Sequence, residues 1–257
     1  MINLDFIKRF YSKDEQVFLK AIIREFLQYQ ILDIIYNSEF WKNLCFLGWT
    51  SIRILYWSKR FSEDLDFDNF WLDEKNFEKL SEKIKKWLEK LWYDVEIKNI
   101  FKWAWHCNIK LPKILFDSWL SNYKEEKILI QIDTVKQDFK YNCVNKYIDK
   151  FWIFNLIKTS PWDVLLSKKI HALLARKRIK WRDFYDILFL LDFTKPNYEY
   201  LSAKIWIWDR EELKWKIKKF CKNLDLNEIA KDVKPFLINQ KELIKIENFI
   251  EFFERKI

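Results

Sequence analysis

The spacing of hydrophobic and polar residues changes near residue 155. Before that point, apolar positions at helical spacing predict a helix over residues 13–36, opened by a capping box from Ser12 to Glu15. Two further helices are predicted over residues 50–56 and over the lysine- and glutamate-rich residues 73–91. Alternating or continuous apolar runs predict strands over residues 43–47, 64–68, 93–100, 107–111 and 127–135.

This mixture of helices and strands predicts a mixed sheet with helices packed on it. From Trp162 to the end of the chain only helical spacing remains, with breaks near Pro196, Asp209 and Pro235. We therefore expect an α/β (α+β) domain over residues 1–157, followed by a helical domain over residues 158–257.

Glycine and tryptophan depart from ordinary usage in opposite directions. The 257 residues contain 1 Gly and 15 Trp, whereas ordinary usage would give roughly 18 Gly. Several tryptophans stand where turns and helix stops favour glycine: Trp92 between a predicted helix and a strand, and similarly Trp152 and Trp181. Either these are true tryptophans that fill the core or bind bases, or UGA encodes glycine in the source lineage and was translated as tryptophan. The second interpretation explains both departures, although a minority of the 15 can still be genuine.

Charge and cysteine usage restrict the functional classes. The 47 Lys and Arg against 38 Asp and Glu give a net charge of +9, which favours an anionic partner such as nucleic acid. AT-rich coding also raises lysine content, so the charge alone leaves a solvated basic surface open. Four cysteines without close pairing or ligand spacing indicate reduced thiols of a cytoplasmic protein. Without a long apolar run or an apolar leader segment, we expect neither a membrane span nor export.

Two carboxylates stand in a context that suits nucleotide chemistry. Asp64 and Asp66 are two apart on a predicted strand and therefore share a face. Such a pair is most often solvated, but two oxygen ligands also suit Mg²⁺ shared with nucleotide phosphates. Upstream, a turn at Gly48 leads into a helix that begins with Thr50 and Ser51, whose free N–H groups could hold a phosphate.

Together these segments resemble the AbiEii-type nucleotidyltransferases of the polymerase-β-like superfamily, which include toxins of abortive-infection and toxin–antitoxin systems. The family motif runs Gly-Gly-Thr-x-Leu-Arg and then Arg-x-Ser-x-Asp-x-Asp-Phe. Its counterparts here are Gly48, Trp49, Thr50, Ile52, Arg53, Arg60, Ser62, Asp64, Asp66 and Phe67. The match departs at Trp49, where glycine would restore the motif and a literal tryptophan would crowd the phosphate loop. Trp57 stands where a glycine often follows the aromatic residue of Leu-Tyr.

The resemblance extends to two further blocks. In "ILIQIDTV" it implies that Asp133 is the third carboxylate, the alternative being an ordinary aspartate at a strand end. In the block from Leu165 to Leu191 it carries over to Lys169, Arg176, Arg182, Asp183 and Asp186. Lys169 would act as a point charge on phosphates, and Asp183 and Asp186 could orient Lys169 and Arg176; a solvated basic stripe is the alternative. We interpret His106 and His171 as packing or surface residues.

The resemblance implies a polymerase-β-like nucleotidyltransferase domain with a mixed sheet, and Mg²⁺-dependent transfer of a nucleoside monophosphate from a nucleoside triphosphate. The acceptor would be RNA, at the tRNA acceptor end, with an antitoxin protein as regulator. The implied catalytic residues are Asp64, Asp66, Asp133, Lys169 and Asp186, with the first three also binding the metal. The implied nucleotide-binding residues are Gly48, Trp49, Thr50, Ser51, Arg53, Arg60, Ser62, Arg176, Arg182 and Asp183. The alternatives are a catalytically silent nucleic-acid-binding or interaction protein, and a transferase that modifies a small molecule or a protein.

Overall fold

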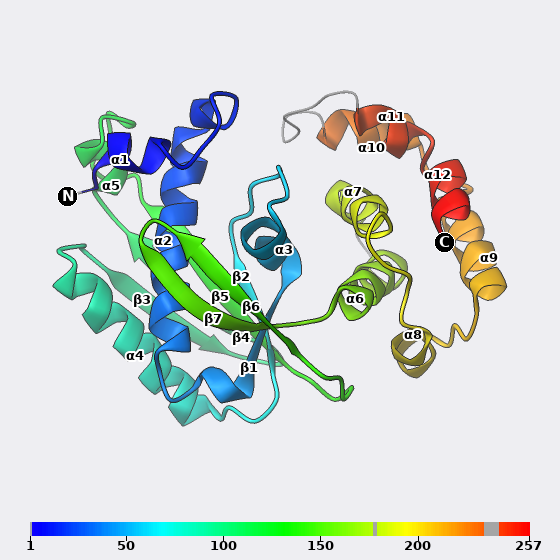
Figure 1. Cartoon of the computed structure of the whole chain (residues 1–257), viewed down its shortest axis with the longest axis horizontal. Helices are drawn as coiled ribbons and strands as arrows, with labels where there is room; N and C mark the ends of the chain where they lie inside the picture. Colours follow the sequence, from blue (N-terminus) through cyan, green and yellow to red (C-terminus); the bar gives the residue numbers. More distant parts are fainter. Residues whose placement is uncertain (1, 177–178, 234–241) are drawn as a thin grey trace. The chain divides into compact units, whose positions relative to one another are not determined.

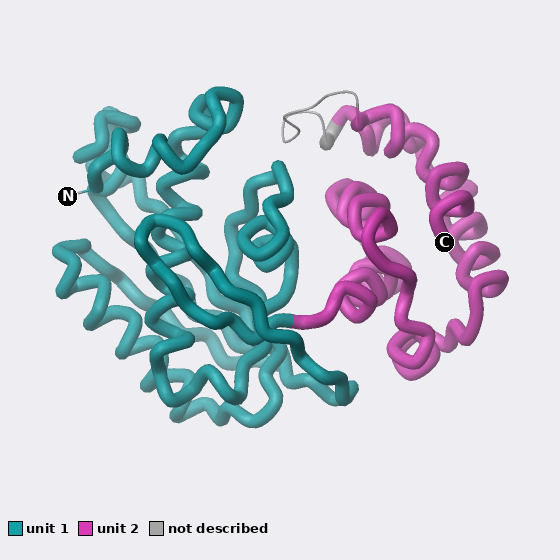
Figure 2. Tube along the Cα trace, viewed as in Figure 1, with its two compact units in different colours: residues 1–159 teal, residues 160–257 magenta. Residues whose placement is uncertain are grey.

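The computed structural model describes residues 2–176, 179–233 and 242–257. The Cα positions divide the chain into two compact units, Met1–Thr159 and Ser160–Ile257 (Figure 2). Each unit is described by itself. None of the helices in the described part of the chain is long and apolar enough to cross a membrane.

Unit 1 contains a seven-stranded mixed sheet with helices (Figure 1). Its helices are α1 (Leu4–Lys8), α2 (Leu19–Tyr36), α3 (Gly48–Tyr56), α4 (Glu74–Lys90) and α5 (Ile114–Asp117), with 3₁₀ turns at Glu15–Val17 and Trp41–Asn43. Its strands are β1 (Leu44–Leu47), β2 (Leu65–Asn69), β3 (Glu96–Phe101), β4 (Trp105–Leu111), β5 (Ile128–Lys136), β6 (Val144–Lys150) and β7 (Ile153–Thr159).

Unit 2 is helical throughout its regular elements in the described ranges. These are α6 (Trp162–Ala175), α7 (Trp181–Leu190), α8 (Tyr198–Ile205), α9 (Arg210–Cys221), α10 (Leu226–Val233), α11 (Leu243–Glu247) and α12 (Phe249–Lys256). The predicted breaks at Pro196 and Asp209 fall between helices, whereas Pro235 lies outside the described residues. The predicted fold class, a mixed α/β sheet followed by helices, is confirmed.

The strand order β3-β4-β5-β2-β1-β7-β6 places β2 at the centre. β2 runs antiparallel to β1 and parallel to β5, and β1 runs parallel to β7. Parallel neighbours need long crossover connections, and here residues 70–127 and 48–152 supply them. Residues distant in sequence are thereby brought onto adjacent strands.

The helices α2, α3 and α4 pack on one face of this sheet. On β6, Lys150 donates to Glu25 of α2, and Lys146, on the same face, lies over the Tyr56 ring of α3. At the other edge, Phe77 of α4 packs on Phe101 with ring centroids 5.9 Å apart. Side chains alternate between the two faces along each strand, so the strand residues next to Lys146, Lys150 and Phe101 point to the opposite face. The helices α2, α3 and α4 leave that face uncovered.

Two sequence expectations differ from the structure. The predicted helix over residues 13–36 begins only at Leu19, because Glu15–Val17 forms a 3₁₀ turn and Phe18 has a non-helical ψ of 53°. The Ser12 hydroxyl does donate to Glu15, at 2.9 Å. The β6–β7 hairpin was not predicted, because apolar residues such as Tyr147 and Phe154 stand exposed on its outer face and obscure the alternation.

A buried arginine ties these elements together. Arg53 of α3 donates to Glu25 of α2 at 2.7 Å, to Glu15 at 2.7 Å and to the Ser58 carbonyl at 2.6 Å. Burial alone would lower the pKa of Arg53, but the two carboxylates raise it above its ordinary value. Arg53 was expected to bind nucleotide; the structure instead gives its guanidinium three partners within unit 1.

We expect Glu15→Gln to lower the free energy of unfolding by about 1.5–3 kcal/mol at neutral pH, because it removes a charge-assisted hydrogen bond. Although burial raises the pKa of Glu15, Arg53 lowers it below the ordinary value of 4.5. The stabilisation is therefore present above pH 4.5 and is lost as the pH falls through the lowered pKa. Urea unfolding at several pH values measures the difference.

Glu126→Gln is the matched control, because Glu126 pairs with Lys20 on the surface and exposed pairs contribute little. Equal effects of the two substitutions at neutral pH would contradict the importance of the Arg53 contacts.

Candidate functional site

The carboxylate of Asp66 lies against the backbone at the start of α3. Leu47, the last residue of β1, pairs with Asp66 of β2, and Gly48 follows with a φ of 77°. A Cβ atom at residue 48 would stand 2.1 Å from Asp66 Oδ2. Only glycine therefore permits this approach. It places a carboxylate beside the N-terminus of a helix, where the helix dipole and free N–H groups stabilise an anion or a metal–phosphate group. The helix was expected to begin with Thr50 after a turn at Gly48, but Gly48 and Trp49 are its first two residues.

Side-chain hydrogen bonds hold the loop that leads into β2. The Thr50 hydroxyl donates to the Asp64 carbonyl and lies 2.7 Å from Ser62 Oγ. From α2, Gln28 donates to the carbonyls of Ser62 and Glu63 at 3.1 and 2.9 Å. These bonds fix the backbone of Asp64, which immediately precedes β2. Thr50 and Ser62, expected to touch the nucleotide, thus hold the loop through their side chains.

Trp49 and Arg60 pack on each other. The Trp49 indole is buried and donates from Nε1 to the Arg60 carbonyl at 3.0 Å. The Arg60 guanidinium lies over the indole, 4.4 Å from the ring centroid. Ser51 is also buried and donates to the Gly48 carbonyl at 2.8 Å. Each of these expected nucleotide-binding side chains therefore has a partner within unit 1.

Asp133 lies directly beside Asp66. The two residues are register partners on the parallel strands β2 and β5, and neighbouring strands are about 4.8 Å apart. Register partners share a face of the sheet, so both carboxylates lie on the face that α2, α3 and α4 leave uncovered. Asp64, Asp66 and Asp133, distant in sequence, are brought to one end of the central strands.

Two side chains that the sequence interpretation missed contact Asp133. His106 of β4 is the register partner of Asp133, and its Nδ1 lies 2.6 Å from Asp133 Oδ1. Gln131, two residues before Asp133, donates from Nε2 to the same oxygen at 2.6 Å. His106 was interpreted as a packing or surface residue. No sequence signal reveals the contact, because it depends on the pairing register of β4 with β5.

The carboxylates suit a metal shared with a nucleotide. Within residues 2–176, 179–233 and 242–257, no group of three His, Cys, Asp or Glu side chains is arranged to hold a metal ion. Mg²⁺ is usually bound by one or two carboxylates together with substrate phosphates. Asp66 beside Asp133, next to a helix N-terminus, fits that mode of binding.

In unit 2, two of the predicted cationic residues pair with two buried aspartates. Lys169 of α6 lies 2.6 Å from Asp186 and 3.6 Å from Asp183, both on α7. Arg176 pairs with the other oxygen of Asp183. The aspartates thus hold a lysine and an arginine seven residues apart. Arg182 lies in the first turn of α7, whose first residue is Trp181, a position expected to be a helix stop or a turn.

His171, the second histidine, matches the packing role expected for it. Its Nδ1 lies 3.3 Å from the Tyr200 hydroxyl. Burial lowers its pKa, and neighbouring lysines and Arg176 lower it further. The imidazole is therefore neutral near pH 7.

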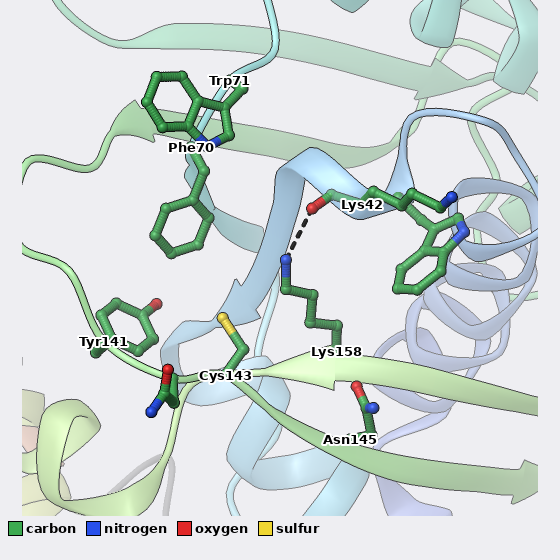
Figure 3. Close-up of a pocket in the computed structure, with 9 residues that line it drawn as sticks. Lys42, Phe70, Trp71, Tyr141, Cys143, Asn145 and Lys158 are labelled. Carbon is green, nitrogen blue, oxygen red and sulfur yellow. Dashed lines mark hydrogen bonds between the residues drawn. The ribbon is translucent and has the colours of Figure 1, made fainter.

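A pocket of about 510 Å³ is lined by residues that include Asn145 of β6 and Lys158 of β7 (Figure 3). Strand register places these two residues on the sheet face that carries Asp66. Tyr141 reaches the pocket from the segment before β6 and donates to Asp68, two residues after Asp66, at 2.5 Å. Phe70 packs on Tyr141 with centroids 5.6 Å apart, and Lys158 donates to the Lys42 carbonyl at 2.7 Å. Aromatic rings beside lysines suit planar and anionic groups, such as those of a nucleic acid.

The fold recurs in solved structures of other proteins. A putative nucleotidyltransferase from Helicobacter pylori is 15% identical, with a TM-score of 0.56 over 96% of this chain and 97% of that one. JHP933 from Helicobacter pylori is 15% identical, with a TM-score of 0.55 over 92% and 93%. MenT4, a nucleotidyltransferase toxin from Mycobacterium tuberculosis, is 12% identical, with a TM-score of 0.55 over 98% and 99%. At these identities the likeness shows the fold alone.

Among curated protein sequences, no relative matches the chain. A family model does match, over residues 30–255, and its description is "Nucleotidyl transferase AbiEii toxin, Type IV TA system". That range contains Gly48, Asp66 and Asp133 together with Lys169 and Asp186. The chain belongs to the AbiEii family of nucleotidyltransferase toxins of type IV toxin–antitoxin systems.

Proposed function

We propose that the protein transfers a nucleoside monophosphate from an Mg²⁺-bound nucleoside triphosphate to a hydroxyl of RNA, at the tRNA acceptor end, and that an antitoxin protein regulates it. One observation carries this proposal. Asp66 lies beside Asp133 and against the Gly48 backbone at the N-terminus of α3. This arrangement offers carboxylates to the metal and backbone N–H groups to the triphosphate.

In the proposed reaction, the acceptor oxygen attacks the α-phosphorus, the bond to the bridging oxygen breaks and pyrophosphate leaves. Asp64 and Asp66 would hold Mg²⁺, which when bound would neutralise charge on the phosphate oxygens. Asp133 would accept the proton of the acceptor hydroxyl or help to hold a second metal ion. The N-terminus of α3 orients the triphosphate through its N–H groups.

In this proposal, the side chains around the loop hold its backbone in place. Thr50, Ser51, Ser62 and Arg60 fix the backbone that meets the phosphates, as their partners within unit 1 indicate. In unit 2, Lys169 supplies positive charge to the phosphates and is oriented by Asp186. Arg176, which Asp183 holds, and Arg182 add further positive charge.

RNA is the acceptor that the surface favours. The net charge of +9 and the aromatic and basic pocket beside Asp68 suit a nucleic acid. We place the protein in the cytoplasm, where nucleoside triphosphates and tRNA occur. A catalytically silent nucleic-acid-binding protein would share these surface features, so the test concerns transfer itself.

We expect Asp66→Asn, and likewise Asp64→Asn, to abolish transfer of labelled nucleotide to bulk tRNA, because the amide keeps the shape of the side chain but loses the charge that binds the metal. Lys169→Ala should cost about 3–4 kcal/mol of transition-state stabilisation, as for other removed charge-stabilising groups. Transfer is measured with each of the four nucleoside triphosphates in turn.

Glu126→Gln, a change on the surface pair with Lys20, is the control and should transfer at the parent rate. Parent-rate transfer by both aspartate variants would overturn the metal assignment. If the parent chain labelled no RNA with any triphosphate, the silent-binder alternative would replace the transferase proposal.

We also propose that UGA-encoded glycines stand as tryptophan in the printed sequence. Among the described residues, seven non-glycine residues have positive φ, and five of them are tryptophan: Trp57, Trp92, Trp119, Trp152 and Trp206. Tryptophan makes up 15 of the 257 residues, so a random set of seven would contain fewer than one. Positive φ is costly for a residue with a Cβ atom and is readily adopted by glycine.

Two of the five stand at the left-handed position of a Schellman motif. After α4, the N–H of Trp92 donates to the Glu89 carbonyl and that of Tyr93 to the Leu88 carbonyl. After α5, the N–H of Trp119 donates to the Phe116 carbonyl and that of Leu120 to the Leu115 carbonyl. This pair of bonds defines the motif, and its left-handed residue is usually glycine.

The other three stand in equally glycine-like places. Trp57 and Trp206 are the left-handed C-caps of α3 and α8. Phe151 and Trp152 are the two residues between the paired ends of β6 and β7, and both have positive φ. That is the pattern of a type I′ hairpin turn, in which glycine is strongly preferred at the second position.

The indoles at these positions add little packing. The five residues are 68 to 94% exposed, although tryptophan is highly buried on average. Trp49 and Trp181 differ, because both have helical backbone. For Trp49 the proposal therefore depends on the family motif, in which a second glycine follows Gly48.

We expect mass spectrometry of the protein from its natural source to find glycine at residues 49, 57, 92, 119, 152 and 206, and their codons to be UGA. Tryptophan at the left-handed positions of the natural protein would disprove this proposal. In the recombinant chain, glycine at each of the five left-handed positions should add about 1 kcal/mol to the free energy of unfolding.

Trp105→Gly is the matched control, because this tryptophan lies within β4 and packs on Phe77 and Phe101. Its replacement should destabilise the fold, since packing is lost and no positive φ is relieved. Equal destabilisation by glycine at residues 92 and 105 would contradict the backbone argument.

A further inference from the structure

The side chains of His106, Gln131 and Asp133 form one cluster on the uncovered face of the sheet. His106 and Asp133 are register partners on β4 and β5, and Gln131 is two residues before Asp133 on the same face. The distances to Asp133 Oδ1 are 2.6 Å from His106 Nδ1 and 2.6 Å from Gln131 Nε2. Both contacts converge on a single carboxylate oxygen.

The donors and acceptors in this cluster determine which nitrogen atoms carry hydrogen. An ionised carboxylate only accepts, so each nitrogen at 2.6 Å must donate. The Gln131 amide turns its NH₂ group, and not its oxygen, towards Asp133. For the same reason His106 carries hydrogen on Nδ1, and the 3.2 Å separation of Gln131 Nε2 from His106 Nδ1 is a contact between two donors. His106 Nε2 then holds the lone pair in the neutral ring.

We propose that His106 and Gln131 are positioning residues that hold Asp133 by its Oδ1 atom and direct Oδ2 towards the reacting groups. The inference rests on the proposed function in assigning Asp133 to the reaction, whereas the proton arrangement rests on geometry alone. Among the described residues, the two donors meet Oδ1 and neither meets Oδ2. Two hydrogen bonds to one oxygen remove the free rotation of the carboxylate about its last bond.

The same arrangement explains why a side chain from β4 takes part in a site built on β2 and β5. Gln131 alone approaches Asp133 from its own strand, along the strand direction. His106 approaches from the neighbouring strand, across the sheet. Two donors from different directions define the plane of the carboxylate, which one donor cannot do.

Nitrogen NMR of the parent chain tests the proton arrangement without any activity measurement. The chain contains only two histidines, His106 and His171, so His171→Gln assigns both rings in a ¹⁵N-histidine spectrum. At a fixed pH at which both rings are neutral, we expect His106 to have a protonated Nδ1 and an unprotonated Nε2. Asp133→Asn should change the His106 shifts and leave those of His171 unchanged.

A neutral His106 ring with its proton on Nε2 would overturn the proposal. So would His106 nitrogen chemical shifts that do not change in Asp133→Asn. Both outcomes are independent of whether any RNA is labelled. Failure of the parent chain to transfer nucleotide, with the expected spectrum, would instead remove the proposed function and leave the positioning contact in place.

Kinetics test the positioning role. We expect His106→Ala to lower kcat by 10- to 100-fold, as removal of partners behind a ligating group commonly does, with the KM for the triphosphate within twofold of the parent. His106→Asn should recover most of the loss, because its amide nitrogen can take the place of Nδ1. Lys110→Ala is the matched control, because Lys110 is exposed on the same face of β4, four residues away.

A thermal melt of each variant separates positioning from folding. The proposal requires His106→Asn to be both folded and substantially active while His106→Ala is folded and slow. Parent-rate transfer by folded His106→Ala would overturn it, and so would equal loss in the alanine and asparagine variants.

Discussion

The approach of the Asp66 carboxylate to the backbone of Gly48 is the contact on which the site depends. A Cβ atom at residue 48 would overlap Asp66 Oδ2 at 2.1 Å, so no other residue can stand there without moving the carboxylate. The contact joins the end of β1, the start of α3 and the start of β2 in one place. It puts negative charge beside the N-terminus of a helix, where the helix dipole and free N–H groups favour it. The proposed metal ion and triphosphate would both bind at this place.

That contact in turn depends on strand register. Leu47 pairs with Asp66, and Asp66 pairs with Asp133, so a slip of one residue in either pairing would move a carboxylate to the helix-covered face. Buried residues such as Phe46 and Phe67, whose ring centroids are 5.3 Å apart, hold the register from the other face. Arg53 adds a polar constraint, because its bonds to Glu15, Glu25 and the Ser58 carbonyl join α3 to α2 and to the following loop. The apolar face and this charged network therefore act together to place the acidic residues.

The sequence predicts much of this fold and part of the site. The apolar runs of β1, β2 and β5 are short and regular, and the Asp-x-Asp spacing places its members on one face. The β6–β7 hairpin escapes prediction because Tyr147 and Phe154 are exposed and a Phe-Trp pair occupies its turn. The carboxylate partners of Arg53 and the contact of His106 with Asp133 also escape, since each joins residues more than 25 positions apart. Periodicity describes which face a residue occupies, whereas long-range partners are fixed only when strands and helices pair.

Backbone conformation at several tryptophans is the one that glycine favours. At Trp57, Trp92, Trp119, Trp152 and Trp206 the chain adopts positive φ, and the indoles remain in solvent. Hydrogen bonds of the neighbouring residues require these conformations, because helix ends and a two-residue hairpin must close there whatever side chain is present. Trp49 is a different case, because its backbone is helical and its buried indole donates to the Arg60 carbonyl beneath the Arg60 guanidinium. Turn geometry thus favours glycine at the five left-handed positions through φ, whereas at residue 49 only the family motif favours it.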